Sequence, residues 1–326
     1  MNNFKKIGIS ALAGSLVAFS VNAAELTVTG GASITFQGQD QTTAGNTWSM
    51  NDNMTFAGSA EMDNGFVVST SFEIDEGDNT GDEDFDSRSL TIAMNDMGTI
   101  TFNATDGVSA MHSIDDMLPY AGGSAGWDMM TKATDSGQTR EGRVTGSNGS
   151  NMMRYTNSTA VDGLAVAVTY LPSSATTGKA QSVTSFNVQY SGIEGLTVGY
   201  AQDDNGAATS AATVDQTAYF ATYAYGPVTI GYQYAEDDAA TAAASDDFSG
   251  YGISYAVSDD LSISYTTTTY DLGSSATDEE TTTIGASYTM GSMSFTATMN
   301  QVDNIGGSTT ALNDVEGYKL GLSFAF

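Results

Sequence analysis

The stretch Leu164-Ala-Val-Ala-Val-Thr-Tyr170 decides the fold of this chain, because it alternates strictly between large apolar and small side chains. Three similar runs follow at residues 196–200, 228–234 and 261–266. A period of two is that of a β-strand, whose successive side chains point to opposite faces of a sheet. No helical period is present after Ala24. The chain is therefore predicted to be all-β, with one apolar face and one face of small or hydroxylated residues.

Short turn signals separate the predicted strands at a regular spacing. They are centred near positions 64, 97, 162, 194, 226, 259 and 291, and five of the six intervals are 32 or 33 residues. Such an interval holds two strands of about ten residues, one tight turn and one longer loop. Seven tight turns divide the chain into eight strand pairs, which predicts sixteen antiparallel strands.

The polarity of the two faces indicates a transmembrane barrel. Small polar side chains cannot fill the interior of a sixteen-stranded closure, so we expect water inside and lipid against the apolar face. The alternative is a large secreted all-β domain with a dry core. Tyrosines near the strand ends are expected to form an aromatic girdle at the lipid headgroups; they are Tyr170, Tyr190, Tyr200, Tyr225, Tyr234 and Tyr270.

The composition excludes several classes of function. The 326 residues include 39 acidic and 9 basic side chains, for a formal charge of −30, so no basic surface is available for nucleic acid. The chain has no Cys, which excludes disulfides and thiol chemistry, and its single His cannot build a histidine cluster for a metal.

Both ends of the chain carry recognisable signals. Lys5 and Lys6 precede an apolar run, and small residues follow at Val21-Asn22-Ala23, as in a secretory signal peptide. We therefore expect residues 1–23 to be a signal peptide and residues 24–326 to be the barrel. At the other end, apolar residues alternate up to Phe326. This resembles the terminal strand of bacterial outer-membrane barrels, which implies recognition by the barrel assembly machinery through Phe326.

The doubled interval, between the fifth and sixth predicted strands at about residues 106–149, is too long for a connection without a role. It contains Asp116-Met-Leu-Pro119, Gly122-Gly123 and Gly142-Arg-Val-Thr-Gly146, and Arg154-Tyr-Thr-Asn-Ser158 follows it. These motifs resemble the third loop of the general diffusion porins. The resemblance implies a homotrimer of sixteen-stranded, water-filled barrels in the bacterial outer membrane, in contact with lipid and lipopolysaccharide, with this loop folded into the lumen of each barrel.

The resemblance also implies a constriction where acidic loop residues face arginines of the wall. Asp116 matches an acidic position, with Asp115 beside it, while Tyr120 stands where the family usually has Glu. Arg88 and Arg143 match wall arginines, and two further basic positions are absent, near Asn53 and Asn103. We therefore expect a weak transverse field. The predicted constriction residues are Asp115, Asp116, Tyr120, Arg88, Arg143 and Arg154.

Alternation gives separate expectations for two of the arginines. Arg154 lies between Met153 and Tyr155, which belong to the apolar face, so its side chain is expected to point into the lumen. Arg88 falls in phase with the apolar Leu90, so an inward direction requires a bulge or a place above the lipid.

The densest acidic run lies between Asp75 and Asp86. Its spacing does not match a known calcium loop, which favours a solvated, self-repelling loop and no cofactor. The alternative is a structural Ca²⁺, or another divalent cation, at Asp78, Asp82 and Asp84. In either case an acidic vestibule raises the local cation concentration, which predicts mild cation selectivity.

Three functions compete at this point. The first is passive diffusion of ions and small hydrophilic solutes through an open pore. The second is a substrate-specific channel, with Tyr120, Trp127 and Trp48 as candidate aromatic contacts. The third is a membrane-barrel enzyme, for which His112 and its neighbour Ser113 are the available catalytic candidates. The porin resemblance favours the first.

Overall fold

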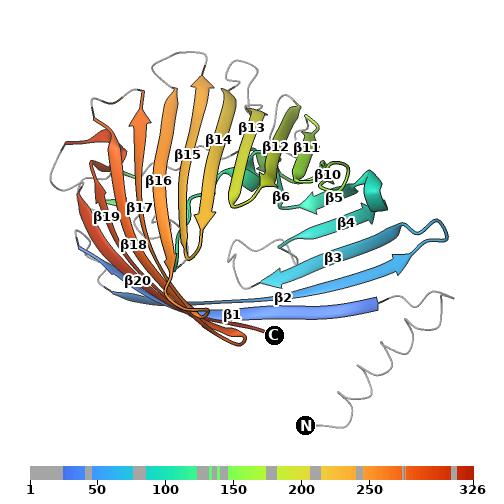
Figure 1. The fold of residues 1–326 in the computed structure, drawn as a ribbon, viewed down its shortest axis with the longest axis horizontal. Helices are drawn as coiled ribbons and strands as arrows, with labels where there is room; N and C mark the ends of the chain where they lie inside the picture. Colours follow the sequence, from blue (N-terminus) through green and yellow to red (C-terminus); the bar gives the residue numbers. More distant parts are fainter. Residues whose placement is uncertain are drawn as a thin grey trace, which may run out of the picture.

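A computed structural model describes residues 25–40, 46–75, 86–122, 132–133, 138–139, 146–173, 182–205, 214–239, 245–273, 275, 277–309 and 314–326. In these ranges sixteen antiparallel strands form one closed barrel (Figure 1). The predicted architecture and strand number are therefore confirmed. The predicted signal peptide, residues 1–23, lies outside the described residues.

Each strand of the barrel pairs with its neighbour in the chain, β5 pairs with β10, and β1 pairs with β20 to close the sheet. The barrel strands are β1 (Glu25–Gln39), β2 (Thr47–Glu61), β3 (Val67–Asp75), β4 (Arg88–Ala93), β5 (Thr99–Thr105), β10 (Met152–Asn157), β11 (Leu164–Leu171), β12 (Val183–Ile193), β13 (Leu196–Asn205), β14 (Val214–Tyr225), β15 (Val228–Ala239), β16 (Asp246–Ala256), β17 (Leu261–Leu272), β18 (Glu279–Met290), β19 (Met293–Asp303) and β20 (Val315–Ala325).

Smaller elements lie between the barrel strands. Two short antiparallel pairs lie within the long interval between β5 and β10, together with one 3-10 turn. The short elements are η2 (Asn95–Met97), β6 (Gly107–Val108), η3 (His112–Ile114), β7 (Lys132–Ala133), β8 (Gln138–Thr139), β9 (Asn148–Gly149) and η5 (Ile305–Gly307). Within the described ranges, no helix has the length and apolar character needed to cross a membrane.

All seven predicted tight turns join consecutive strands of the barrel. Gly195 and Gly291 illustrate why these positions carry glycine, because their φ angles of 75° and 61° lie in the left-handed region that other residues rarely adopt. The regularly spaced turn signals therefore mark hairpins between consecutive strands, as predicted.

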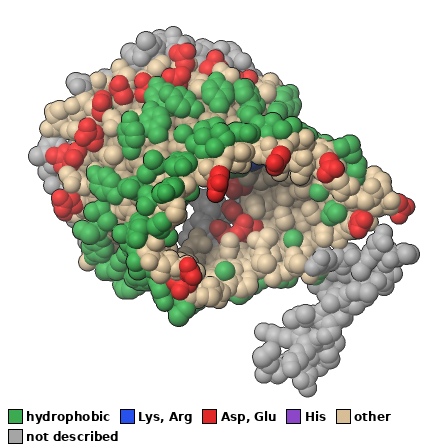
Figure 2. Space-filling view, in the orientation of Figure 1, with side chains coloured by type: hydrophobic (Ala, Val, Ile, Leu, Met, Phe, Trp, Pro, Cys, Tyr) green, Lys and Arg blue, Asp and Glu red, His purple; other side chains and the backbone are tan. Residues whose placement is uncertain are grey.

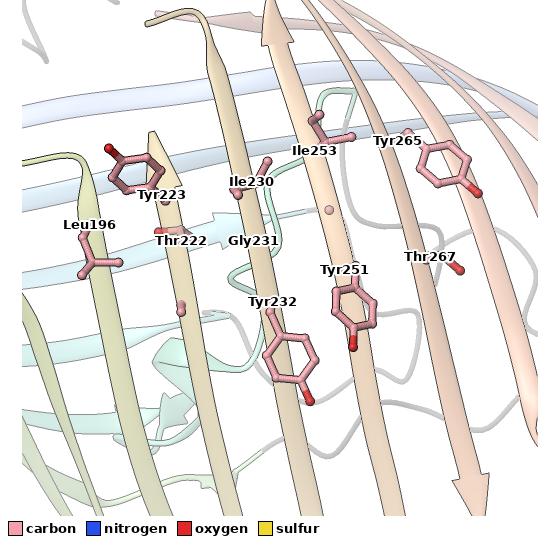
Figure 3. Close-up of a pocket in the computed structure, with 12 residues that line it drawn as sticks. Leu196, Thr222, Tyr223, Ile230, Gly231, Tyr232, Tyr251, Ile253, Tyr265 and Thr267 are labelled. Carbon is pink, nitrogen blue, oxygen red and sulfur yellow. The ribbon is translucent and has the colours of Figure 1, made fainter. Parts of the chain in front are cut away.

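The apolar positions of the alternating pattern form the exposed outer face. Ile230, Ile253 and Tyr265 are 50%, 43% and 46% exposed, whereas Gln233 and Thr266 on the opposite face are buried. Figure 3 shows residues of β13 to β17 that line a shallow apolar groove on this outer face. Contiguous apolar exposure on this scale is typical of a surface that meets lipid.

Aromatic residues on the outer face contact one another across the strands. The rings of Tyr219 and Tyr234 lie 5.0 Å apart, and those of Tyr232 and Tyr251 lie 4.9 Å apart. Five of the six tyrosines expected in the girdle lie on this face. Tyr270 is the exception, because it lies in phase with the buried Thr266 and Thr268 and packs against an apolar cluster on the opposite face.

Trp48 also belongs to the outer face. It is 72% exposed, and its ring lies 4.6 Å from that of Phe36, which in turn contacts Tyr318. The suggestion that Trp48 lines a solute path is therefore wrong, since its neighbours are apolar residues of the exterior. Trp127, the other tryptophan, lies outside the described residues.

The last strand closes the barrel as its alternation predicts. β20 pairs with β1 in the register Ile34 to Leu322, and Phe326 continues this pairing by exchanging backbone hydrogen bonds of 2.8 and 2.9 Å with Gly30. The Phe326 side chain itself is 70% exposed. Its recognition by the assembly machinery stays a prediction.

Neighbouring residues of β16 test which face meets lipid. Ile253→Arg places a charge on the outer face and is expected to lower the free energy of unfolding by about 2 to 4 kcal/mol in lipid vesicles. Ser254→Arg, one residue further on and on the opposite face, is the matched control and is expected to change it by less than about 1 kcal/mol. Urea titrations of both variants measure this difference, and equal costs would show that the exterior is not hydrocarbon.

Candidate functional site

After β5 the chain leaves the sheet and crosses the small-residue face of the barrel. We call residues 109–122 the crossing segment. It contacts strands from β11, at Thr169, to β19, at Thr298. Every wall side chain that binds it belongs to the face opposite the exposed apolar residues.

Hydrogen bonds to side chains hold the crossing segment at intervals along its length. Its backbone amides donate to hydroxyl or amide oxygens of β11, β12, β15 and β17. The distances are 3.2 Å from Ala110 to Thr169 Oγ1, 3.0 Å from Met111 to Ser185 Oγ, 2.7 Å from Met117 to Gln233 Oε1, and 2.7 Å from Ala121 to Ser264 Oγ. The polar face therefore supplies the partners that the irregular backbone needs.

Glycines in the wall make room for the far end of the segment. A Cβ at Gly250 would lie 2.6 Å from Leu118 Cδ1, and one at Gly252 would lie 2.9 Å from the Pro119 carbonyl oxygen. A Cβ at Gly285 would overlap the Ala121 carbonyl. Glycine inside a strand often marks such a close approach of another backbone.

An apolar cluster anchors residues 111–118 of the segment. Met111, Ile114 and Leu118 pack against small and aromatic residues of the wall, among them the buried Phe220 and Phe248. These two contacts were not predicted from the sequence. The signal was present, because each phenylalanine interrupts the small-residue phase of its strand, and the inward-facing Tyr270 does the same.

A buried carboxylate holds the returning end of the long interval. Asp203 of β13 accepts hydrogen bonds from the Ser147 backbone amide at 3.0 Å and from its hydroxyl at 2.7 Å. Ser147 in turn accepts a 2.9 Å hydrogen bond from the Ser109 amide, next to the paired β6 and β9. The two ends of the interval are thus fastened together and to the wall.

The predicted acidic residues lie on the crossing segment, in two different environments. Asp115 is buried, and its Oδ2 lies 3.4 Å from Nδ1 of His112. Asp116 is half-buried, and its Oδ2 accepts a 3.4 Å hydrogen bond from the hydroxyl of Tyr120. Tyr120, which stands where the family usually has Glu, therefore binds the Asp116 carboxylate and does not add a second carboxylate.

The arginines of the predicted constriction are not all brought together. Arg154 lies on the polar face beside η3, in a cavity that Ser113 also lines. Arg88 is exposed and pairs with Phe72, and the register of β4 and β5 shifts beside it, so the bulge considered from the sequence is present. Arg143 lies outside the described residues.

The local geometry does not support the enzyme alternative. Ser113 Oγ donates a 2.7 Å hydrogen bond to the Ala110 carbonyl, so it is not poised as a nucleophile activated by His112. In the part of the chain that the structure describes, no group of three or more potential metal ligands is found. Asp78, Asp82 and Asp84 fall outside that part, and the divalent site there stays a prediction.

Carboxylates gather around the opening of the barrel. Figure 2 shows a hollow in one face of the molecule with Asp and Glu side chains at its rim and inside it. Partial burial, followed by the charges of Asp75, Asp106 and Glu73, raises the pKa of the Asp86 carboxyl above its usual value. The three neighbouring carboxylates, although a smaller cause of this shift than desolvation, contribute a negative potential beside β3 and β4.

Comparisons with known proteins agree with this geometry. The sequence matches the family model described as Gram-negative porin over residues 8–307. The fold is similar to an anion-selective porin from Comamonas acidovorans, at 13% identity and a TM-score of 0.69, covering 93% of this chain and all of the other. It is also similar to OmpT of Vibrio cholerae, at 14% identity and a TM-score of 0.67, covering 94% and 99%. No curated protein sequence matches.

The closed barrel and its polar interior face define the protein as a channel of the bacterial outer membrane, not an enzyme. The family match covers most of the chain. The chain therefore belongs to the Gram-negative porins, as the motifs around the long interval predicted.

Gly285→Val tests the close packing of the crossing segment. The added side chain meets the Ala121 backbone, so we expect the loss of the Ala121–Ser264 hydrogen bond and a free energy of unfolding lower by about 1 to 3 kcal/mol. Thermal unfolding and protease sensitivity of residues 109–122 measure the effect. Ser287→Val, on the same face of β18, is the control, and equal behaviour of the two variants would contradict this packing.

Proposed function

We propose that this porin is a passive pore for ions and small hydrophilic solutes, narrowed by the crossing segment. The observation that carries the proposal is the attachment of residues 109–122 to the polar face of consecutive strands from β11 to β19. A closed sheet has one inner and one outer face, and the outer face here is the apolar one. Because the crossing segment lies on the inner face, it reduces the cross-section of the water-filled pore. Size and charge at this constriction then select solutes without any chemical step.

We further propose that the pore prefers cations mildly. The formal charge of −30 and the repelling carboxylates near Asp86 both favour a negative potential at the entrance. The porin that is described as anion-selective shares only 13% identity with this chain, so selectivity can differ between the two proteins.

Planar-bilayer recordings test the pore and its preference together. Purified protein is expected to give discrete conductance steps, with a reversal potential that indicates cation preference under an about tenfold salt gradient. The preference is expected to weaken as total salt rises, because screening shortens the reach of the carboxylates. A clear anion preference would contradict this selectivity, and the absence of steps would contradict the pore itself.

A sugar-specific channel is not favoured. One of its aromatic candidates, Trp48, lies on the exterior, and another, Tyr120, is hydrogen-bonded to Asp116. Neutral sugars are therefore not expected to block the current in a saturable manner.

We also propose that the protein assembles as a homotrimer in contact with lipid and lipopolysaccharide. We further propose that the barrel assembly machinery recognises Phe326. The porin family and the exposed Phe326 ring support this proposal. Protein extracted from outer membranes without heating is expected to migrate at three times the chain mass. A chain that ends at Ala325 is expected to accumulate several-fold less in the outer membrane. Migration as a monomer, or equal accumulation, would contradict the respective half of the proposal.

A further inference from the structure

A polar cavity of about 260 Å³ lies between η3 and the inner face of β10 to β12. We call it the Arg154 cavity. Ser113 of η3 lines it on one side, and Arg154, Thr156 and Gln189 line it on the wall. Its space arises from Ala165 and Ala167, whose short side chains occupy β11 where a larger residue would fill the gap. Asn95, Gly98 and Thr99 before and at the start of β5, with Ser158 and Thr159 after β10, complete the lining, so the cavity lies near the turns that join these strands.

The charge balance of the Arg154 cavity is opposite to that of the whole chain. The protein has 39 acidic residues, yet none of the residues that line this cavity is acidic. Arg154 is the cation among them, and its buried Nε has no hydrogen-bond partner. Arg154 also has no ion-pair partner among the described residues, so the part of its guanidinium that lines the cavity is available to a ligand that brings acceptor oxygens.

The neighbouring polar groups divide into structural and available ones. The Asn187 amide nitrogen donates 2.6 and 2.8 Å hydrogen bonds to the Ala110 carbonyl and to Ser113 Oγ, so it holds η3 in place. Thr156 and Gln189 are on the same face as Arg154 and are directed to the cavity. Their hydroxyl and amide groups can donate beside the guanidinium.

We propose that the Arg154 cavity binds a small oxyanion, a carboxylate or phosphate group, through the guanidinium of Arg154 with Thr156 and Gln189 as further donors. The planar guanidinium matches two oxygens of such a group with parallel N–H bonds. The inference deepens the proposed function, because the anion reaches the cavity from the pore. A pore that prefers cations at its entrance thereby retains a local site for small acids beside the constriction.

Equilibrium binding to the detergent-solubilised full chain tests the proposal without relying on conductance. Isothermal titration with inorganic phosphate and, separately, with acetate is expected to show one saturable site for which the two anions compete. Arg154→Gln is expected to raise the Kd by about tenfold or more, and Arg154→Lys by less, because the charge remains while the paired donors are lost. The anion with the lower Kd shows whether the cavity prefers phosphates or carboxylates.

Two further variants separate the cavity from general charge effects. Lys319→Gln removes one positive charge from the same face of β20 and is expected to leave the Kd within about twofold. Ala165→Leu keeps Arg154 but fills the space, and is expected to abolish binding. Barrel formation by each variant is checked by circular dichroism and heat-modifiable migration.

The outcomes distinguish this inference from the proposed function. Absence of binding to a wild-type protein that conducts overturns the inference alone, as does equal binding by Arg154→Gln. Binding that Lys319→Gln weakens as much as Arg154→Gln also overturns it. Anion binding by a protein that forms no pore supports the cavity and contradicts the proposed function.

Discussion

The structure depends on one constraint, which is that a sheet edge cannot be left unpaired in hydrocarbon. Each open N–H or C=O group costs several kcal/mol where no water can replace the missing partner. Pairing of β1 with β20 removes both edges, and the last residue, Phe326, is still part of this pairing through Gly30. Closure in turn creates an inside and an outside, and the two phases of the alternating pattern then acquire their different environments.

Much of the fold could be predicted because alternation and turn chemistry are local properties. The strand number, the seven tight turns and the position of the long interval all follow from spacing along the chain. Alternation also gives the inward faces of Tyr270, Phe220 and Phe248, but it could not predict why large side chains occupy these positions. Their burial comes from contact with the crossing segment, which is distant in sequence, and this contact makes an inner position apolar.

The site was predictable to a smaller extent. Motif resemblance located Asp115, Asp116 and the interval that carries them, and alternation gave the face of Arg154. It could not show that Asp115 is buried against His112, because that depends on the 3-10 turn. Neither resemblance nor alternation could reveal the Arg154 cavity, because the cavity exists only where alanines of β11 lie beside residues of β10 and β12.

The way the crossing segment is fastened has a consequence for how such proteins diversify. Its amides bind Thr, Ser and Gln side chains, while the main chains of the wall remain fully engaged with one another. Remodelling the segment therefore does not disturb the ladder that keeps the barrel intact. Substitutions in the segment can therefore change which solutes pass through the pore, while the strand pairing that membrane insertion requires stays the same. Permeation and barrel stability can thus evolve separately.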